Sequence, residues 1–233
     1  MCKGSLCLAL SSVFLASTMF TAPIVHAATK EEAAQQRINA AIKVVDQMKQ
    51  QPQLARSLER AAGVFIIPHY GKGGFIVGGQ GGGGVLLERR GTDWSYPAFY
   101  SIGGGSVGAQ AGGEAGAIAM ILMTSKALHK FEDTSNTWSL NGNAGLTVVN
   151  WSGKAQANTG NGDVIVWSDT NGLYGGVTAS VTDITPDTGL DRAYYGHSAD
   201  ARQILSDQVK NRDANALRHV LAARGSMENR PAG

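Results

Sequence analysis

Glycine is concentrated in one part of this chain. Of 31 glycines in 233 residues, 28 lie between Gly63 and Gly196. Within this window short apolar runs alternate with glycine, as in the stretch KGGFIVGGQGGGGVLLERR at 72–90. Glycine inside strands marks bulges, sharp bends and places where one backbone passes close to another. The distribution therefore predicts a β-rich body with a small, strongly curved sheet.

Seven short segments in or near this window have the composition of β-strands. They are Gly63–Ile67, Gly74–Val77, Gly84–Glu88, Ala98–Ile102, Leu140–Val149, Val164–Trp167 and Leu173–Asp183. Segments this short and this regularly punctuated are typical of a mostly antiparallel sheet or a partly closed barrel. With helical arms on either side, the expected fold class is α+β, with N-terminal and C-terminal helices packed on the sheet.

The N-terminal arm has the periodicity of an amphipathic helix. Its apolar residues recur at steps of three and four: Ala34, Ile38, Ala41, Ile42, Val45 and Met48. This spacing places them on one helix face, and a shorter helix is expected over 54–60. Two interpretations of the apolar face stay open. It packs on the protein's own body, or it also meets lipid or a protein partner.

Three further helices are expected. Thr124, Ser125 and Lys126 can begin a helix that runs to Phe131, after the apolar segment Ile118–Met123. Two closing helices are predicted over Ser198–Val209 and Ala214–Ala223, and residues 225–233 are expected to form a disordered tail. No linker composition interrupts residues 28–224, so a single domain is predicted there.

The first 27 residues have the composition of a secretory signal. Lys3 precedes an apolar stretch from Leu6 to Phe20, and Val25-His26-Ala27 stands before the expected mature start at Ala28. Both cysteines lie inside this segment, so the mature chain is expected to have no thiol and no sulfur-based metal site. The predicted location is periplasmic or envelope-associated.

Charge and hydropathy exclude several function classes for the mature chain. Removing Lys3 lowers the formal net charge from +2 to +1. A net charge this small gives the protein as a whole no strong electrostatic attraction to nucleic acid or to a membrane. No second apolar run approaches the roughly 20 residues that a membrane-spanning helix needs. The histidines have no metal-ligand spacing, and no metal site is expected.

Two glycine-rich segments match motifs of nucleotide-binding and hydrolytic sites, but the residues that follow them do not have the secondary structure that such sites need. Residues 79–84 and 103–108 both match G-x-G-x-x-G, which holds a pyrophosphate only where the glycines close a strand and open a helix. A strand pattern follows the first motif and a poor helix start follows the second. Residues 104–108 also match G-x-S-x-G, the motif that surrounds the nucleophilic serine of many hydrolases, here Ser106. In those enzymes the serine sits on a turn between a strand and a helix, and this chain lacks the alternation of strands and helices that such a fold needs. Nucleotide binding and serine hydrolysis are both disfavoured.

Six further blocks occur in order along the chain: AGVFIIP at 62–68, KGGFIVGGQGGG at 72–83, GSVGAQAG at 105–112, IAMILMTSKAL at 118–128, SDTNGLYGGV at 168–177 and AYYG at 193–196. Together they resemble the SYLF, or Ysc84-type, lipid-binding domain family. The resemblance implies an α+β domain that binds anionic phospholipids, without enzymatic activity and without a cofactor. Eukaryotic relatives are tied to phosphoinositides and actin. For an exported bacterial-type protein, phosphatidic acid, phosphatidylglycerol or cardiolipin is the expected lipid.

A basic patch is the mechanism that we expect for lipid binding. Each lysine or arginine near an anionic membrane surface contributes about 1 kcal/mol to the binding free energy. An apolar helix or loop that inserts into the membrane would add to the affinity. The candidate residues are Arg37, Lys43, Lys49, Lys72, Arg89 and Arg90. The alternative is an envelope scaffold protein that binds a protein partner through the amphipathic N-terminal helix.

Overall fold

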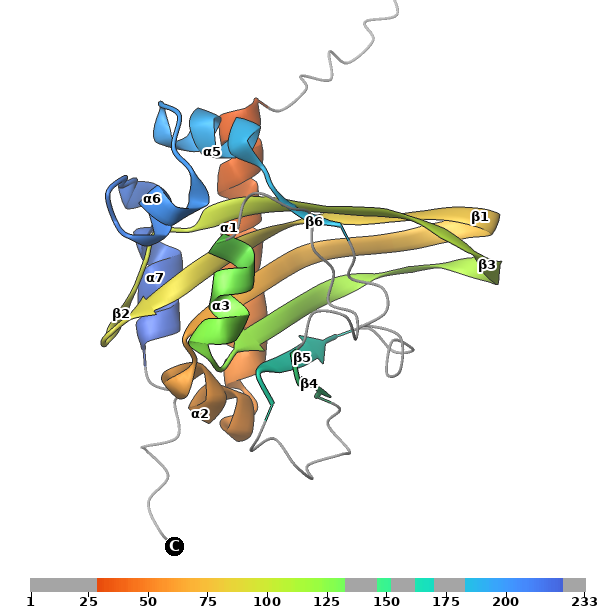
Figure 1. Cartoon of the computed structure of the whole chain (residues 1–233), viewed down its shortest axis with the longest axis horizontal. Coiled ribbons are helices and arrows are strands. Elements are labelled where there is room, and N and C mark those ends of the chain that lie inside the picture. The colour runs from red at the N-terminus through yellow and green to blue at the C-terminus, as the bar shows by residue number, and fades with distance from the viewer. Residues whose placement is uncertain (1–28, 133–145, 152–161, 170–182, 224–233) are drawn as a thin grey trace, which may run out of the picture.

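The computed structural model describes residues 29–132, 146–151, 162–169 and 183–223, with the side chains of all but 72–80, 104–115 and 150. Its architecture is the expected α+β fold, a mostly antiparallel sheet with N-terminal and C-terminal helices packed on it (Figure 1). The predicted signal segment, the tail and most of the predicted strand Leu173–Asp183 lie outside the described residues.

Two long strands form the body of the sheet. β1 (Gly63–Arg90) pairs antiparallel with β3 (Ala98–Leu122), from Gly63 opposite Leu122 to Leu86 opposite Ala98. Figure 1 shows this two-stranded ribbon running out to a tip and returning. The register of the β1–β3 pairing shifts between Ile67 and Tyr70 and again between Gly74 and Ile76. Irregularities of this kind bend a strand. Three segments that the sequence suggested as separate strands therefore belong to β1, because glycine accepts the extended backbone without ending the pairing.

Among the described residues, shorter strands extend this ribbon into a six-stranded sheet of order β2-β1-β3-β5-β4, with β6 paired to β3 off that path. β2 (Asp93–Trp94) follows β1, β5 (Val164–Ser168) pairs antiparallel with the end of β3, and β4 (Val148–Asn150) runs parallel to β5. β6 (Ile184–Pro186) pairs with the start of β3.

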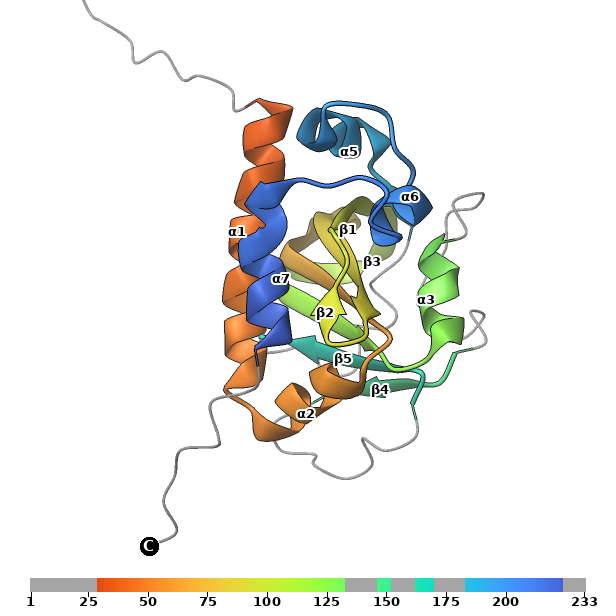
Figure 2. The same cartoon turned by 90° about the vertical axis from the view of Figure 1, so that its left-hand side faces the viewer.

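Helices cover the sheet from both ends of the described chain. Their bounds are Lys30–Lys49 (α1), Pro52–Arg60 (α2), Ser125–Glu132 (α3), Thr188–Tyr195 (α5), Ala201–Leu205 (α6) and Asn215–Ala222 (α7), with a 3-10 turn over Arg212–Ala214 (η2). α1 begins at a capping box in which the Thr29 hydroxyl accepts from the Glu32 amide. Figure 2 shows α7 lying along α1, and the two helices are in contact.

The apolar face of α1 is buried against the protein itself. Five of its six predicted residues have no exposed area, namely Ala34, Ile38, Ala41, Val45 and Met48, and Ile42 is partly buried against the same core. They pack in the same hydrophobic core as β1, β3, α5 and α7. The hypothesis that this face meets lipid or a partner is therefore wrong, because exposing it would cost about 25 cal/mol for each Å² of apolar area.

Close approach explains the glycines at the base of the ribbon. A Cβ atom at Gly82 would lie 2.6 Å from the carbonyl oxygen of His69, on the other half of the same strand. A Cβ atom at Gly84 would overlap the ring of Phe65. The outgoing and returning halves of β1 can pack this tightly only where side chains are absent.

The two glycine motifs pair with each other. Gly79 lies opposite Gly105 and Gly81 lies opposite Gly103 in the β1–β3 ladder. Ser106 lies opposite Gly78 in the middle of β3, in extended backbone. Neither motif opens a helix, so the geometry that a pyrophosphate site or a nucleophile elbow requires is missing here.

Candidate functional site

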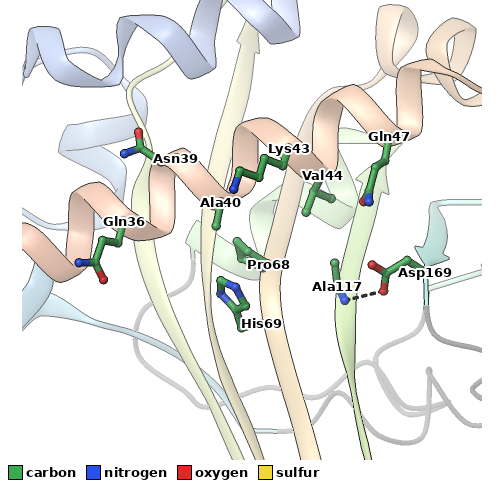
Figure 3. Close-up of a pocket in the computed structure, with 10 residues that line it drawn as sticks. All are labelled: Gln36, Asn39, Ala40, Lys43, Val44, Gln47, Pro68, His69, Ala117 and Asp169. Atoms are coloured by element: carbon green, nitrogen blue, oxygen red, sulfur yellow. Dashed lines mark hydrogen bonds between the residues drawn. The ribbon is translucent and has the colours of Figure 1, made fainter.

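A groove of about 370 Å³ lies between the outer face of α1 and the sheet (Figure 3). α1 contributes Gln36, Asn39, Ala40, Lys43, Val44 and Gln47, β1 contributes Pro68 and His69, β3 contributes Ala117, and Asp169 follows β5. The volume falls within the range of small-molecule sites in proteins.

The lining of the groove divides into a buried apolar floor and an exposed polar rim. Val44, Pro68 and Ala117 are buried, whereas the Lys43 and His69 side chains are exposed. Lys43 has no hydrogen-bond or ion-pair partner among the described residues. An ammonium without a partner above a concave surface is a candidate contact for an anionic group.

Asp169 is held in place at one end of the groove. Its carboxylate Oδ1 accepts from the Ala117 amide at 2.7 Å, and its own amide donates to the Ala117 carbonyl at 3.3 Å. These two hydrogen bonds extend the β3–β5 ladder by one residue, which fixes the position of the carboxylate.

Arg37 is the first of the predicted site residues that the structure places elsewhere. Its guanidinium donates to the Tyr100 carbonyl at 3.3 Å, lies 3.9 Å from the Asp187 carboxylate and stacks 5.9 Å from the centre of the Phe99 ring. Burial lowers its pKa, partly opposed by Asp187 and Asp191. Arg37 therefore ties α1 to β3 rather than facing an external ligand.

Three more of the predicted cations occupy the carboxyl ends of helices. Lys49 donates to the carbonyls of Val220, Leu221 and Ala223 at the end of α7. Arg89 donates to the carbonyls of Leu58 and Ala61 at the end of α2. Such carbonyls have no partner within their own helix and carry partial negative charge, so they attract cations.

Arg90 is the third predicted cation at the carboxyl end of a helix. Its guanidinium donates twice to the Leu205 carbonyl at the end of α6, at 3.1 and 2.7 Å, and pairs with Glu88 at 3.0 Å. Lys72 lies in β1 opposite Glu114, and its side chain is outside the described residues. Four of the six predicted residues thus bond to carbonyls or carboxylates within the protein, so the six do not form one patch of free cations. Contact of these residues with lipid stays a prediction.

Lys49→Met is expected to lower the free energy of unfolding by about 1 kcal/mol, the usual contribution of a cation at a helix C-terminus together with its hydrogen bonds. Lys43→Met, on the same helix but without a partner among the described residues, is expected to change it by less than about 0.5 kcal/mol. Urea unfolding of both variants measures the difference. Equal losses would show that Lys49 does not cap α7.

Most of the residues that line the groove were not predicted from the sequence. Gln36, Asn39, Lys43 and Gln47 recur on the exposed face of α1, so their spacing was available as a signal. No sequence pattern indicated that His69 and Asp169, which are far apart along the chain, lie opposite this face, because their place depends on how the ribbon bends.

Within the described ranges, no group of three His, Cys, Asp or Glu side chains is placed to hold a metal ion. None of the helices described has both the length and the hydropathy needed to cross a bilayer.

Comparisons with known proteins match this chain to one family. Residues 103–224 match the Ysc84 family, described as "Las17-binding protein actin regulator". Protein YSC84 and LAS seventeen-binding protein 3, both of Saccharomyces cerevisiae, are each 30% identical over 159 residues, which is 66% of this chain and 34% of the relative. An SH3 domain-containing protein of Schizosaccharomyces pombe is 30% identical over 145 residues, or 59% of this chain and 33% of the relative.

The chain thus spans about a third of the length of these curated relatives. No solved structure matches it. The family match covers more than half of the chain, including most of β3, α3 and all the C-terminal helices. The chain belongs to the Ysc84 (SYLF) domain family.

Proposed function

We propose that this protein binds anionic phospholipids at an envelope membrane surface through the α1 groove, without catalysis. The observation that carries the proposal is the exposed Lys43 ammonium, which has no partner among the described residues and stands at the rim of a concave polar site. Membership of the Ysc84 family supports it, since the resemblance implies lipid binding for such domains.

The mechanism differs from the basic patch that the sequence suggested. One free lysine near an anionic surface contributes about 1 kcal/mol, which is too little to hold the protein alone. The remaining affinity comes from polar contacts between the lipid head group and the groove. We therefore expect binding to depend on the head group and to respond only modestly to salt, because few counterions are released.

Lys43→Glu is expected to weaken binding to anionic vesicles by roughly ten-fold, since it replaces an attraction with a repulsion. The measurement is co-sedimentation of the protein lacking residues 1–27, which contains every described element, with phosphatidylcholine vesicles with and without anionic lipid. Lys210→Glu makes the same charge change at an exposed lysine outside the groove and serves as the control.

Three results would count against this proposal. The first is no binding to any vesicle, the second is equal binding to neutral and anionic vesicles, and the third is an equal loss in both variants. Far-ultraviolet circular dichroism of each variant separates a binding defect from a folding defect. Arg89→Glu is unsuitable for this purpose, because it removes the cation at the end of α2.

The proposal also includes export. The expected cleavage after Ala27 would place the domain in the periplasm or at the envelope, in reach of phosphatidic acid, phosphatidylglycerol or cardiolipin. N-terminal sequencing of the protein from fractionated cells tests this point: a start at Ala28 in the envelope fraction supports it, and retention of residues 1–27 in the cytosol contradicts it.

Binding of a protein partner is the second candidate function. The family's description as a Las17-binding actin regulator favours it. Because the apolar face of α1 is buried, a partner would have to contact another surface of the domain. Absence of vesicle binding by a folded protein would leave this candidate as the preferred one.

A further inference from the structure

We propose that the α1 groove selects a hydroxylated phosphodiester head group over a phosphomonoester, with Asp169 as the residue that sets this preference. Phosphatidylglycerol carries the first kind of head group and phosphatidic acid the second. This proposal rests on the proposed function and specifies which lipid head group the same groove binds.

The rim offers more hydrogen-bonding capacity than one phosphate can use. Gln36, Asn39 and Gln47 each present an amide with two donor hydrogens, and all three are exposed on α1. The oxygens of Gln36 and Gln47 are also acceptors, whereas Asn39 Oδ1 already accepts from the Gln35 amide at 3.0 Å. Carboxamides of this kind hydrogen-bond hydroxyl groups in either direction. The buried floor formed by Val44, Pro68 and Ala117 suits the C–H face of a polyol.

The charges of the groove favour a single negative charge on the ligand. Lys43 supplies a positive charge, and the Asp169 carboxylate supplies a negative one in the same groove. The two hydrogen bonds between Asp169 and Ala117 keep that carboxylate from moving away from a ligand. A phosphodiester carries one charge, which Lys43 neutralises. A phosphomonoester gains a second charge near neutral pH, which the Asp169 carboxylate repels.

The experiment compares binding of the protein lacking residues 1–27 to two sets of phosphatidylcholine vesicles. One set contains phosphatidylglycerol and the other contains phosphatidic acid at the same mole fraction. We expect about five-fold tighter binding to the phosphatidylglycerol vesicles, the effect of one unfavourable charge near a membrane surface. Soluble glycerophosphoglycerol should compete for this binding more strongly than glycerol 3-phosphate does.

Asp169→Asn is the decisive variant. Its amide oxygen can still accept from the Ala117 amide, so the position is kept while the charge is removed. We expect binding to phosphatidic acid to rise to the level of phosphatidylglycerol. Asp46→Asn removes an exposed carboxylate of α1 outside the groove and should leave the preference unchanged.

The outcomes separate this inference from the proposed function. Equal binding of the parent protein to both anionic lipids, or an unchanged preference in Asp169→Asn, overturns the inference while lipid binding stands. Lack of competition by glycerophosphoglycerol overturns it too, since contact would then be with the vesicle surface as a whole. No binding to either vesicle would end the proposed function itself.

Discussion

Gly82→Ala is expected to lower the free energy of unfolding by about 3 kcal/mol, the upper part of the range for an overpacked interior. The added methyl group would lie 2.6 Å from the backbone oxygen of His69, and a backbone atom cannot move aside as a flexible side chain can. The two halves of β1 would have to separate, with loss of packing around the buried Ile67. Urea unfolding followed by circular dichroism measures the change.

Gly71→Ala provides the matched control on the same strand. Nothing lies within 4 Å of a Cβ atom at this position, and the residue is exposed. The change is expected to be neutral or slightly stabilising, because alanine restricts the unfolded chain. Equal stability of the two alanine variants would show that the halves of the ribbon are not in close contact at Gly82.

Asp191→Asn is expected to stabilise the protein at neutral pH and to leave it nearly unchanged at pH 4. The Asp191 side chain has no exposed area; Oδ1 accepts from the Phe99 amide at 3.0 Å, and Oδ2 has no hydrogen-bond partner among the described residues. Burial raises its pKa from 3.8 to about 7; the neighbouring Asp187 carboxylate adds to this effect, while the Phe99 amide and Arg37 oppose it.

The direction of the pH dependence follows from proton uptake. Between about pH 4 and about pH 7 the folded protein keeps this proton while the unfolded chain has lost it, so stability falls as pH rises through this window. At about 1.4 kcal/mol for each pKa unit, the total is on the order of 4 kcal/mol. Asparagine resembles the protonated acid and removes the dependence.

The measurement is the difference in unfolding free energy between parent and Asp191→Asn from pH 4 to pH 8. Taking the difference cancels the contributions of other titrating groups, among them Glu88, whose pKa burial also raises. A difference that stays constant over this range would show that Asp191 is ionised in the folded protein throughout.

Local patterns predicted the helices better than the strands. The three-and-four spacing of α1 and the threonine before α3 depend on neighbours in sequence, and both helices formed where expected. α5 was missed although Asp187 caps its start and Gly196 ends it in the left-handed conformation. Separate strands were expected within β1 because glycine usually interrupts a strand, whereas here glycine in β1 pairs with glycine in β3.

The site was predictable only in part, for a physical reason. Sequence shows which residues carry charge, but not which backbone carbonyls they will meet. Lys49 and Arg90 donate to carbonyls 171 and 115 positions away, and no spacing rule covers such distances. Lys43 was among the residues predicted for the site, and the structure adds the residues that line the groove around it.

The packing of α1 against α7 has a consequence for synthesis. The first described helix is covered partly by the last, and Lys49 meets its carbonyl partners only when residues 220–223 are present. α1 leaves the ribosome well before α7, so the part of α1 that α7 covers stays exposed until residues 215–223 have been made. The packing of α1 is therefore completed only after nearly all the other described elements have emerged.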